Sequence, residues 1–367
     1  MDGMTIVQLA AGLGLLVLGA ELLVRGASRL AASVGVSQLV IGLTVVAYGT
    51  STPELAVSLQ AALAGNADIA VANVVGSNIF NVLFILGACA AMKPLLVHRQ
   101  LVRLEVPIMI AASVLLMALS WDGKLGRWDG ALLFLGITVY TVWVIRRSRR
   151  EEAVAVAAGT PGSAASKKPQ KTASRIAVPV GCVLAGLAFL VLGARWLVKS
   201  AIQLAAAMGV SDVVIGLTIV AAGTSLPEVF TSLVATLRGE RDIAIGNVVG
   251  SNIYNILMII GVSSMVTPDG LRVAPSLLNF DMEVMLAVAA ACLPVFFTGY
   301  SIARWEGWLF LGGYAAYTAY LIMDATGHDA LPAFSHVMLM FVLPLLAVTI
   351  LVVALNSLRP PRRGNQR

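Results

Sequence analysis

The chain contains one long motif twice, and this duplication limits its possible folds more than any other feature. The first copy reads GLTVVAYGTSTPELAVSL from Gly42 and continues with DIAVANVVGSNIFNVLFILG from Asp68. The second copy reads GLTIVAAGTSLPEVFTSL from Gly216 and continues with DIAIGNVVGSNIYNILMIIG from Asp242. The two copies align without a gap at a shift of about 174 residues, which predicts an internal structural repeat.

Each copy of the motif carries one glutamate inside an otherwise apolar segment, Glu54 in the first and Glu228 in the second. The composition is that of a membrane protein, because 59% of the residues are hydrophobic, 12% are charged and the mean hydropathy is +0.90. An ionisable side chain at membrane depth costs several kcal/mol unless a partner neutralises it. We therefore expect both glutamates to be functional.

Apolar runs of about 17–25 residues, the length that crosses a bilayer as a helix, recur along the whole chain. They do not alternate between apolar and polar residues, as the strands of a membrane barrel would. The sequence therefore predicts an all-α polytopic membrane protein. Its eleven predicted spans lie at residues 5–24, 39–63, 69–91, 105–121, 128–146, 176–198, 212–237, 243–266, 282–298, 306–323 and 332–357.

The net charge of +6 indicates orientation in a membrane rather than a nucleic-acid partner. Most of the 25 Lys and Arg residues fall on the cytoplasmic side if the N-terminus lies outside. We therefore expect a multi-pass protein of the cell membrane (a prokaryotic inner membrane), in contact with the lipid bilayer, with its N-terminus outside and its C-terminus in the cytoplasm. The cysteines lack metal-ligand spacing and are expected to be buried thiols: Cys89, Cys182 and Cys292.

Residues 147–175 are rich in Ala, Gly, Ser, Pro and Lys and predict a flexible cytoplasmic linker. The linker separates a first five-helix repeat at 1–146 from a second at 176–323. Because five is odd, the second repeat must enter the membrane with the opposite orientation. Such inverted-topology repeats are typical of secondary transporters, whose binding site lies at the midplane. Residues 324–367 are interpreted as an extra C-terminal transmembrane helix with a basic cytoplasmic tail.

A proline breaks the helix in each copy, Pro53 in GTSTPE and Pro227 in GTSLPE. Proline lacks an N–H and clashes with the carbonyl four residues back, so nearby carbonyls such as that of Gly49 are expected to lose helical partners and to line a polar cavity. Helical spacing gathers further oxygens on the same faces. The side chains in this predicted cluster are Thr50, Ser51, Glu54, Ser58, Asn73, Ser77, Asn81, Thr224, Ser225, Glu228, Ser232, Asn247, Ser251 and Asn255.

This cluster contains many oxygens but no His, Cys or Lys, which favours a hard cation over a transition metal. Two ionised glutamates carry a charge that one Ca²⁺ or two Na⁺ would neutralise. Because an empty site would be unfavourable in a low dielectric, one cation type or protons should replace another, which is the physical basis of exchange. A proline kink, or any one of these Ser or Asn residues taken alone, could instead have a purely structural role in helix packing. Glu105 and Glu283, at the starts of spans, are interpreted as caps or interfacial charges.

The motifs GTSTPE, GTSLPE, ANVVGSNIFN and GNVVGSNIYN resemble the alpha-repeats of the calcium/cation antiporter superfamily, in particular its prokaryotic sodium/calcium exchanger branch. The resemblance implies a ten-helix core that binds Ca²⁺ between Glu54 and Glu228, helped by Thr50 and Thr224. It also implies that the first and sixth spans slide across this core. The last site position of the second copy is Asn255 where several relatives carry Asp, which weakens a potassium requirement. The implied Na⁺ positions are built from the carbonyls of Ala47 and Ala221 with Ser51, Ser77, Ser225, Ser251 and Asn81.

The sequence thus predicts a secondary active antiporter, not an enzyme, that works as a monomer without a cofactor. It would exchange Ca²⁺ for Na⁺ by alternating access and export calcium with the sodium gradient. A proton/calcium exchanger is the nearest alternative, although proton-coupled members of the superfamily usually lack the paired GTSxPE motif. A cation channel would conduct without counter-transport. An intramembrane protease would need an Asp pair and a route for peptide, and would leave the Ser, Thr and Asn residues unexplained.

Overall fold

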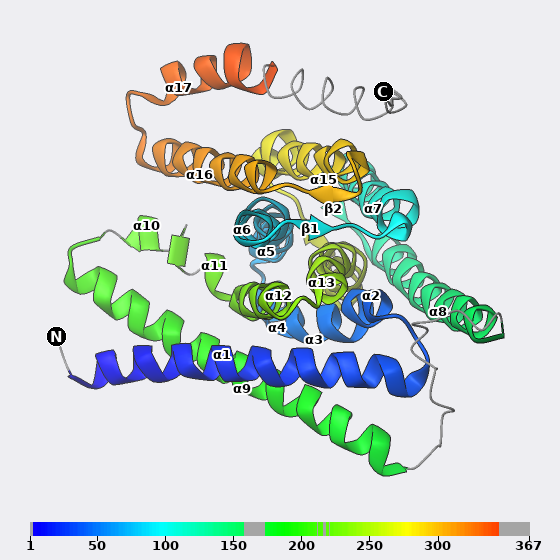
Figure 1. Ribbon diagram of the computed structural model, residues 1–367. Coiled ribbons are helices and arrows are strands. Elements are labelled where there is room, and N and C mark those ends of the chain that lie inside the picture. Colours follow the sequence, from blue (N-terminus) through cyan, green and yellow to red (C-terminus); the bar gives the residue numbers. More distant parts are fainter. Residues whose placement is uncertain (1–2, 158–172, 211, 216–217, 220, 345–367) are drawn as a thin grey trace, which may run out of the picture.

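The first half of the chain folds into helices, as predicted, with two very short strands. The computed structural model describes residues 3–157, 173–210, 212–215, 218–219 and 221–344 (Figure 1). The elements of the first half are α1 (Gly3–Val34), α2 (Gln38–Ile41), the π-helical segment η1 (Gly42–Val46), α3 (Ala47–Thr50), α4 (Thr52–Leu63), α5 (Ala67–Phe80), the π-helical segment η2 (Asn81–Leu86), α6 (Gly87–Met92), β1 (Leu95–Leu96), the π-helical segment η3 (Leu101–Glu105), α7 (Val106–Leu119), β2 (Lys124–Leu125) and α8 (Arg127–Ala157).

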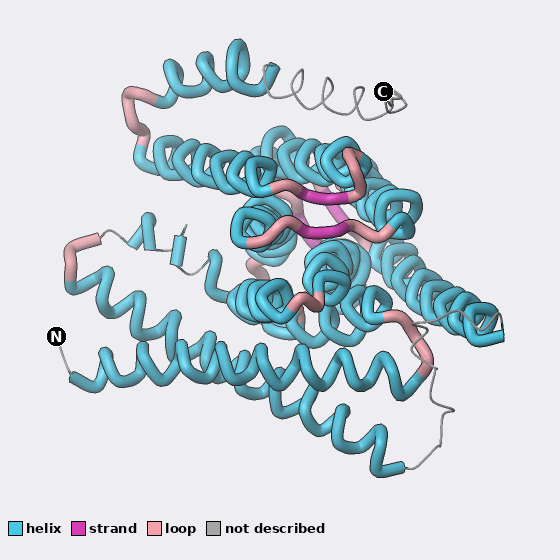
Figure 2. The backbone as a smooth tube through the Cα atoms, viewed as in Figure 1, coloured by secondary structure: helices cyan, strands magenta, loops and turns pink. Residues whose placement is uncertain are grey.

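Apart from a counterpart of η1, the described residues of the second half repeat this order of elements and add two segments at the end (Figure 2). Its elements are α9 (Ala173–Ala207), α10 (Asp212–Ile215), α11 (Ala221–Gly223), α12 (Leu226–Arg238), α13 (Arg241–Tyr254), the π-helical segment η5 (Asn255–Ile260), α14 (Gly261–Val266), β3 (Leu271–Arg272), the π-helical segment η6 (Leu277–Asp281), α15 (Met282–Phe297), β4 (Ser301–Ile302), α16 (Arg304–Thr326), α17 (Leu331–Val337) and the π-helical segment η7 (Met338–Val342).

Seven helical segments in the described part of the chain are long and apolar enough to cross a membrane, against eleven predicted spans. An eighth span results if Gln38–Thr50 and Thr52–Leu63, which meet at a bend of 45°, are counted together. Helix α16 covers the predicted span at 306–323 but is not among the seven, since glycines, tyrosines and a threonine dilute its apolar residues. The predicted spans at 212–237 and 332–357 include residues that lie outside the described ones, so both stay predictions.

The prediction of a linker at residues 147–175 needs a correction at both ends. Helix α8 continues to Ala157, past the predicted boundary at residue 146. The sequence there alternates helix-forming Arg, Glu and Ala residues, and Arg147 pairs with Glu151 one turn later at 2.8 Å. Helix α9 begins at Ala173. The predicted linker residues 158–172 lie outside the described part of the structure.

Helices α1 and α9, which open the two halves, cross on one side of the molecule and run antiparallel (Figure 1). Gly19 packs directly against Gly186, and a Cβ atom added to Gly19 would lie 2.8 Å from the Gly186 carbonyl oxygen. A Cβ on Gly186 would lie 2.6 Å from the backbone nitrogen of Leu23. Such backbone contact between membrane helices requires small residues. The opposite directions of α1 and α9 agree with an inverted second half.

The strands give a second sign of this inversion. Strand β1 pairs with β4 and β2 pairs with β3, in two separate antiparallel sheets. Helix α7 separates β1 from β2, so the two sheets lie at opposite ends of the membrane-crossing helices. Strand β1 follows α6 in the first half as β3 follows α14 in the second. Equivalent strands of the two halves therefore lie at opposite ends of the bundle.

The centre of the bundle is formed by the third span of each half (Figure 1). In the span Arg241–Val266, 94% of the most apolar stretch is buried, whereas the value for α1 is 28%. The corresponding first-half span is Ala67–Met92, with 72% buried. Both central spans change from α-helix to π-helix at an asparagine, Asn81 or Asn255. Because π-helical turns inside α-helices often mark functional sites, these two asparagines point to the centre of the bundle as the site.

Candidate cation site

The predicted helix breaks are present in both halves, and they have the same conformation. Ser51 separates α3 from α4 with φ −81° and ψ 9°, and Ser225 precedes α12 with φ −87° and ψ 5°. Each proline lies in the first turn of the following helix, where its missing N–H costs nothing. The Ala47 carbonyl still accepts hydrogen bonds from the Ser51 N–H (3.0 Å) and the Thr50 hydroxyl (3.3 Å). The break therefore does not leave this carbonyl without a partner, and its role as a cation ligand stays a prediction.

The two glutamates are buried, and each is held by the serine of the other half. Glu54 and Glu228 are both 1% exposed. The Ser225 hydroxyl donates to Oε1 of Glu54 at 2.8 Å, and the Ser51 hydroxyl donates to Oε1 of Glu228 at 2.8 Å. The second carboxylate oxygen of each glutamate is buried without a hydrogen-bond partner among the described residues. Each half thus supplies an acid whose second oxygen is free to bind something else.

Two asparagines that the sequence prediction missed fix the orientation of the two that it selected. The Asn81 amide nitrogen donates to Oδ1 of Asn252 at 3.1 Å, and the Asn255 amide nitrogen donates to Oδ1 of Asn78 at 3.1 Å. The Oδ1 atoms of Asn81 and Asn255 are therefore left buried without partners. The signal was present in GSNIFN and GSNIYN, where two asparagines stand three residues apart and so share a helix face.

The other predicted asparagine and serine pairs connect neighbouring helices. The Asn73 amide nitrogen donates to the Ser58 hydroxyl at 2.9 Å, and that of Asn247 donates to the Ser232 hydroxyl at 3.0 Å. These contacts join α4 to α5 and α12 to α13. Asn247 also accepts a hydrogen bond from the Thr50 hydroxyl at 3.1 Å. The amide nitrogens of Asn73 and Asn247 both donate to serines on the helices that carry the glutamates. These pairs therefore position the acids rather than supply further oxygens without partners.

Several buried oxygens at the predicted site have no hydrogen-bond partner among the residues that the structure describes. In a membrane interior an unpaired polar atom is costly, so it needs an explanation. Within the described residues no group of three or more His, Cys, Asp or Glu side chains could hold a metal, so the charge of this cluster is limited to its two glutamates. The Ser77 hydroxyl lies 3.3 Å from that of Ser225. Among the residues predicted for the site, the unpaired buried oxygens are Glu54 Oε2, Glu228 Oε2, Asn81 Oδ1, Asn255 Oδ1, Thr224 Oγ1 and Ser251 Oγ.

The residue at one predicted position, Ala221, begins helix α11, directly before the break of the second half.

The first-half break borders an open crevice of about 440 Å³. This crevice begins at Gly49 and Thr52 and follows α9 from Leu187 to Arg195, toward the C-terminal end of that helix. At the opposite end of the bundle, Glu21 on α1 forms ion pairs with Arg25 and with Arg238 on α12. The crevice thus borders the helix break at one end, and the ion pairs lie where α12 ends.

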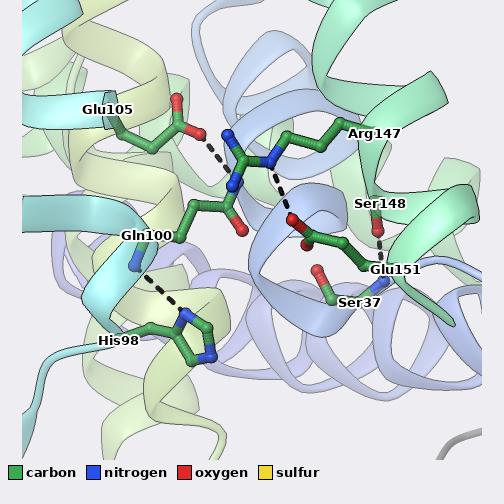
Figure 3. A network of polar contacts seen from close by, with 7 residues as sticks. All are labelled: Ser37, His98, Gln100, Glu105, Arg147, Ser148 and Glu151. Carbon is green, nitrogen blue, oxygen red and sulfur yellow. Dashed lines mark hydrogen bonds and ion pairs between the residues drawn. The ribbon is translucent and has the colours of Figure 1, made fainter. Parts of the chain in front are cut away.

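Glu105 belongs to a separate group of polar contacts, and Figure 3 shows its contact with Gln100. Glu105 accepts hydrogen bonds from the Tyr140 hydroxyl at 2.6 Å and from the Gln100 amide at 2.8 Å. It is 0% exposed, so the expectation of a cap or interfacial charge is wrong for Glu105. That expectation overlooked a tyrosine 35 residues away in the sequence. Both Glu105 oxygens have protein partners, whereas Glu54 and Glu228 each have one oxygen without a partner.

The chain matches the model of the sodium/calcium exchanger protein family over residues 4–146 and 178–323. It is 37% identical to the inner membrane protein YrbG of Escherichia coli, over 77% of this chain and 85% of that protein. It is 33% identical to the sodium/calcium exchanger MaX1 of Methanosarcina acetivorans, over 84% and 96%. A structure of the sodium-calcium exchanger NCX_Mj superposes with a TM-score of 0.74 and 30% identity, covering 88% of this chain and 100% of that one. The chain therefore belongs to the sodium/calcium exchanger protein family, whose members are membrane antiporters for cations and not enzymes.

Proposed function

We propose that this antiporter exchanges Ca²⁺ for Na⁺ by alternating access and exports calcium with the energy of the sodium gradient. The observation that carries the proposal is the set of six buried oxygens without partners at the predicted site, which come from both halves and include one oxygen of each glutamate. Oxygen ligands without nitrogen or sulfur suit hard cations, and Ca²⁺ takes 6–8 of them. Two of the relatives named above are described as sodium/calcium exchangers.

In the proposed arrangement Ca²⁺ lies between Glu54 and Glu228 and is assisted by Thr50 and Thr224. The reciprocal hydrogen bonds from Ser51 and Ser225 support it, because they hold one oxygen of each acid and leave the other available. Sodium ions would occupy neighbouring positions formed by the remaining oxygens. These are the carbonyls of Ala47 and Ala221 and the side chains of Ser51, Ser77, Ser225, Ser251, Asn81 and Asn255.

The charge of the proposed site determines which cations can replace one another there. One Ca²⁺ or two Na⁺ neutralise two ionised glutamates, so either cation can restore the charge balance when the other leaves. If more than two Na⁺ replace each Ca²⁺, every cycle moves net charge and the rate responds to membrane voltage. Both second-half amides at the site are neutral, Asn247 and Asn255, so K⁺ finds no additional carboxylate there.

We further propose two five-helix repeats, at 1–146 and 176–323, with an added helix and basic tail at 324–367. The antiparallel α1 and α9 and the opposite positions of β1 and β3 support this division. The proposed orientation places the N-terminus outside and the C-terminus in the cytoplasm, because the excess of Lys and Arg then lies inside. Each half contributes to every part of the proposed site, so one chain suffices and a monomer is the proposed functional unit.

Calcium uptake into proteoliposomes tests the choice of coupling ion. A Na⁺ gradient is imposed while pH and K⁺ are varied separately. We expect uptake to follow the Na⁺ gradient, to persist without a pH gradient and to be independent of K⁺. Uptake that follows the pH gradient and ignores Na⁺ would show a proton/calcium exchanger instead. Calcium flux without any counter-ion gradient requirement, together with a measurable conductance, would show a channel.

A further inference from the structure

We propose that Met109 is a positioning residue for the ion site, because its sulfur sets the direction of the hydrogen bond between Asn252 and Asn81. This inference rests on the proposed exchange function, in which the Asn81 amide oxygen is a sodium ligand. Met109 lies on α7 and is 1% exposed. The Asn252 amide nitrogen donates to the Met109 sulfur at 3.3 Å, and Oδ1 of Asn252 accepts from the Asn81 amide nitrogen at 3.1 Å. The sulfur thus begins a short chain of hydrogen bonds that ends at Asn81.

The orientation of the Asn252 amide decides which atom Asn81 can offer to a cation. An amide group carries an acceptor oxygen on one side and a donor NH₂ on the other. In the observed orientation Asn252 offers its oxygen to Asn81, and Oδ1 of Asn81 is left buried without a partner among the described residues. If the Asn252 amide were reversed, its NH₂ would face Asn81, which would have to accept with its own oxygen. Asn81 would then have only its NH₂ left, and a donor repels a cation.

The Met109 sulfur is the acceptor on which this orientation depends. Within the described part of the chain, the Asn252 amide nitrogen has no other hydrogen-bond acceptor. The Asn252 side chain belongs to the centre of the bundle and is 2% exposed. A buried N–H without an acceptor is costly, so the NH₂ of Asn252 stays on the side of the sulfur. Removal of the sulfur therefore removes the preference for the observed orientation.

The corresponding contact of the other half is held more firmly. Met109 and Met285 are equivalent, because each lies four residues after the end of a π-helical segment, η3 or η6. The Asn78 amide nitrogen lies 3.7 Å from the Met285 sulfur, and it also donates to the Asn252 backbone carbonyl at 3.2 Å. A carbonyl oxygen is a better acceptor than a thioether sulfur. Asn78 can therefore keep its orientation without Met285, whereas Asn252 depends on Met109.

Methionine suits this position because its sulfur accepts a weak hydrogen bond without competing for the transported cations. Hard cations such as Ca²⁺ prefer oxygen ligands, whereas thioethers bind soft metals such as Cu(I). An aspartate or glutamate at residue 109 would add charge and oxygens to the centre of the bundle, and a leucine would offer no acceptor. Met109 can thus orient the amide of Asn252 without becoming an ion ligand itself.

Replacement of the sulfur by a methyl group tests this role. Met109→Leu conserves the apolar volume and removes the acceptor. We expect the Na⁺ concentration at half-maximal exchange to rise by about 3-fold, because the loss of one weak neutral hydrogen bond shifts an equilibrium by a few fold. Equilibrium Ca²⁺ binding without Na⁺ should stay close to the wild-type value, since the proposed Ca²⁺ position lies between Glu54 and Glu228. An unchanged Na⁺ concentration, or an equal change for both ions, would overturn the proposal.

Two matched variants make the same change at other buried methionines. Met285→Leu removes the sulfur beside Asn78, which retains its carbonyl acceptor, so the Na⁺ concentration at half-maximal exchange should stay near the wild-type value. Met282→Leu replaces a methionine on α15 that is 0% exposed and whose sulfur has no hydrogen bond with the described residues. This variant should also resemble the wild type. An equal rise in all three leucine variants would show an effect of packing and would overturn the proposal.

A double-mutant cycle tests whether Met109 acts through Asn252. In Asn252→Ala there is no amide to orient, so the addition of Met109→Leu should raise the Na⁺ concentration at half-maximal exchange little further. Full additivity of the two changes would overturn the proposal.

The same measurements separate this inference from the proposed function. Wild-type exchange that does not respond to Na⁺ would overturn the proposed function and this inference with it. Na⁺-driven exchange with the same Na⁺ dependence in the wild type and in Met109→Leu would overturn this inference alone.

Discussion

Ser51 donates a hydrogen bond of 2.8 Å to Glu228, although the two residues belong to opposite halves of the chain. Ser225 and Glu54 repeat this contact at the same distance in the opposite sense. Each half therefore supplies the donor that holds the acid of the other. Because every buried acid at the centre needs the opposite half, neither half can form the proposed cation site by itself.

Ser51→Ala and Ser225→Ala should have closely similar effects. Each removes a hydrogen bond to a charged group, an interaction worth about 1.5–3 kcal/mol, so each should weaken cation binding by about 10-fold or more. The measurement is the Ca²⁺ and Na⁺ concentration at half-maximal exchange. Thr52→Ala, which removes an exposed hydroxyl bound to the Tyr48 carbonyl, serves as the control. Wild-type behaviour of either serine variant would contradict the reciprocal arrangement.

Asn78 and Asn255 should behave as one unit. Asn78 accepts a hydrogen bond of 3.1 Å from the Asn255 amide nitrogen, and Oδ1 of Asn255 is left without a partner. Asn78→Ala should therefore reduce exchange almost as much as Asn255→Ala. The double variant should be little worse than either single one, because residues that share an interaction do not add. A double-mutant cycle on exchange rates measures this coupling, and full additivity would show that the two asparagines act separately.

Much of this arrangement could be predicted from the sequence, and the missing parts have a common cause. The helical fold, the two breaks and the meeting of Glu54 with Glu228 follow from the duplicated motif and its proline. The partners of Glu105 could not be predicted, because Tyr140 lies 35 residues away and tertiary packing brings the two together. The same holds for Asn78 and Asn252, whose contacts cross between the halves. The helix at the start of the predicted linker was missed because the prediction relied on the overall composition of residues 147–175. It did not consider the Arg147–Glu151 pair, which stabilises a helix there.

Gly19→Ala should impair the protein because its backbone touches that of Gly186. The new Cβ atom would lie 2.8 Å from the Gly186 carbonyl oxygen, which forces α1 and α9 apart. We expect a lower exchange rate and a lower melting temperature. Gly14→Ala is the matched control on the same helix, since nothing lies within 4 Å of a Cβ atom there. Equal behaviour of the two variants in a thermal melt and in transport would mean that the close contact of the helices is unimportant.

Tyr140→Phe should destabilise the protein without changing its ion dependence. It removes the 2.6 Å hydrogen bond to Glu105 and leaves a buried carboxylate oxygen unpaired, which costs about 1–3 kcal/mol. We expect a melting temperature lower by a few degrees and unaltered Na⁺ and Ca²⁺ concentrations at half-maximal exchange. Tyr317→Phe, which removes the corresponding 2.7 Å contact to the partly buried Asp281, should have a smaller effect. A changed ion dependence in Tyr140→Phe would show that Glu105 takes part in transport.

Equilibrium binding of radioactive Ca²⁺ to the purified protein, without Na⁺, tests most directly whether Glu54 and Glu228 share one cation. A shared site predicts one Ca²⁺ for each chain. It also predicts that Glu54→Gln and Glu228→Gln each abolish this binding, since either variant leaves only one of the two negative charges. Glu283→Gln, which changes an exposed glutamate, should bind as the wild type does. Two Ca²⁺ for each chain, or full binding by either Glu54→Gln or Glu228→Gln, would contradict a shared site.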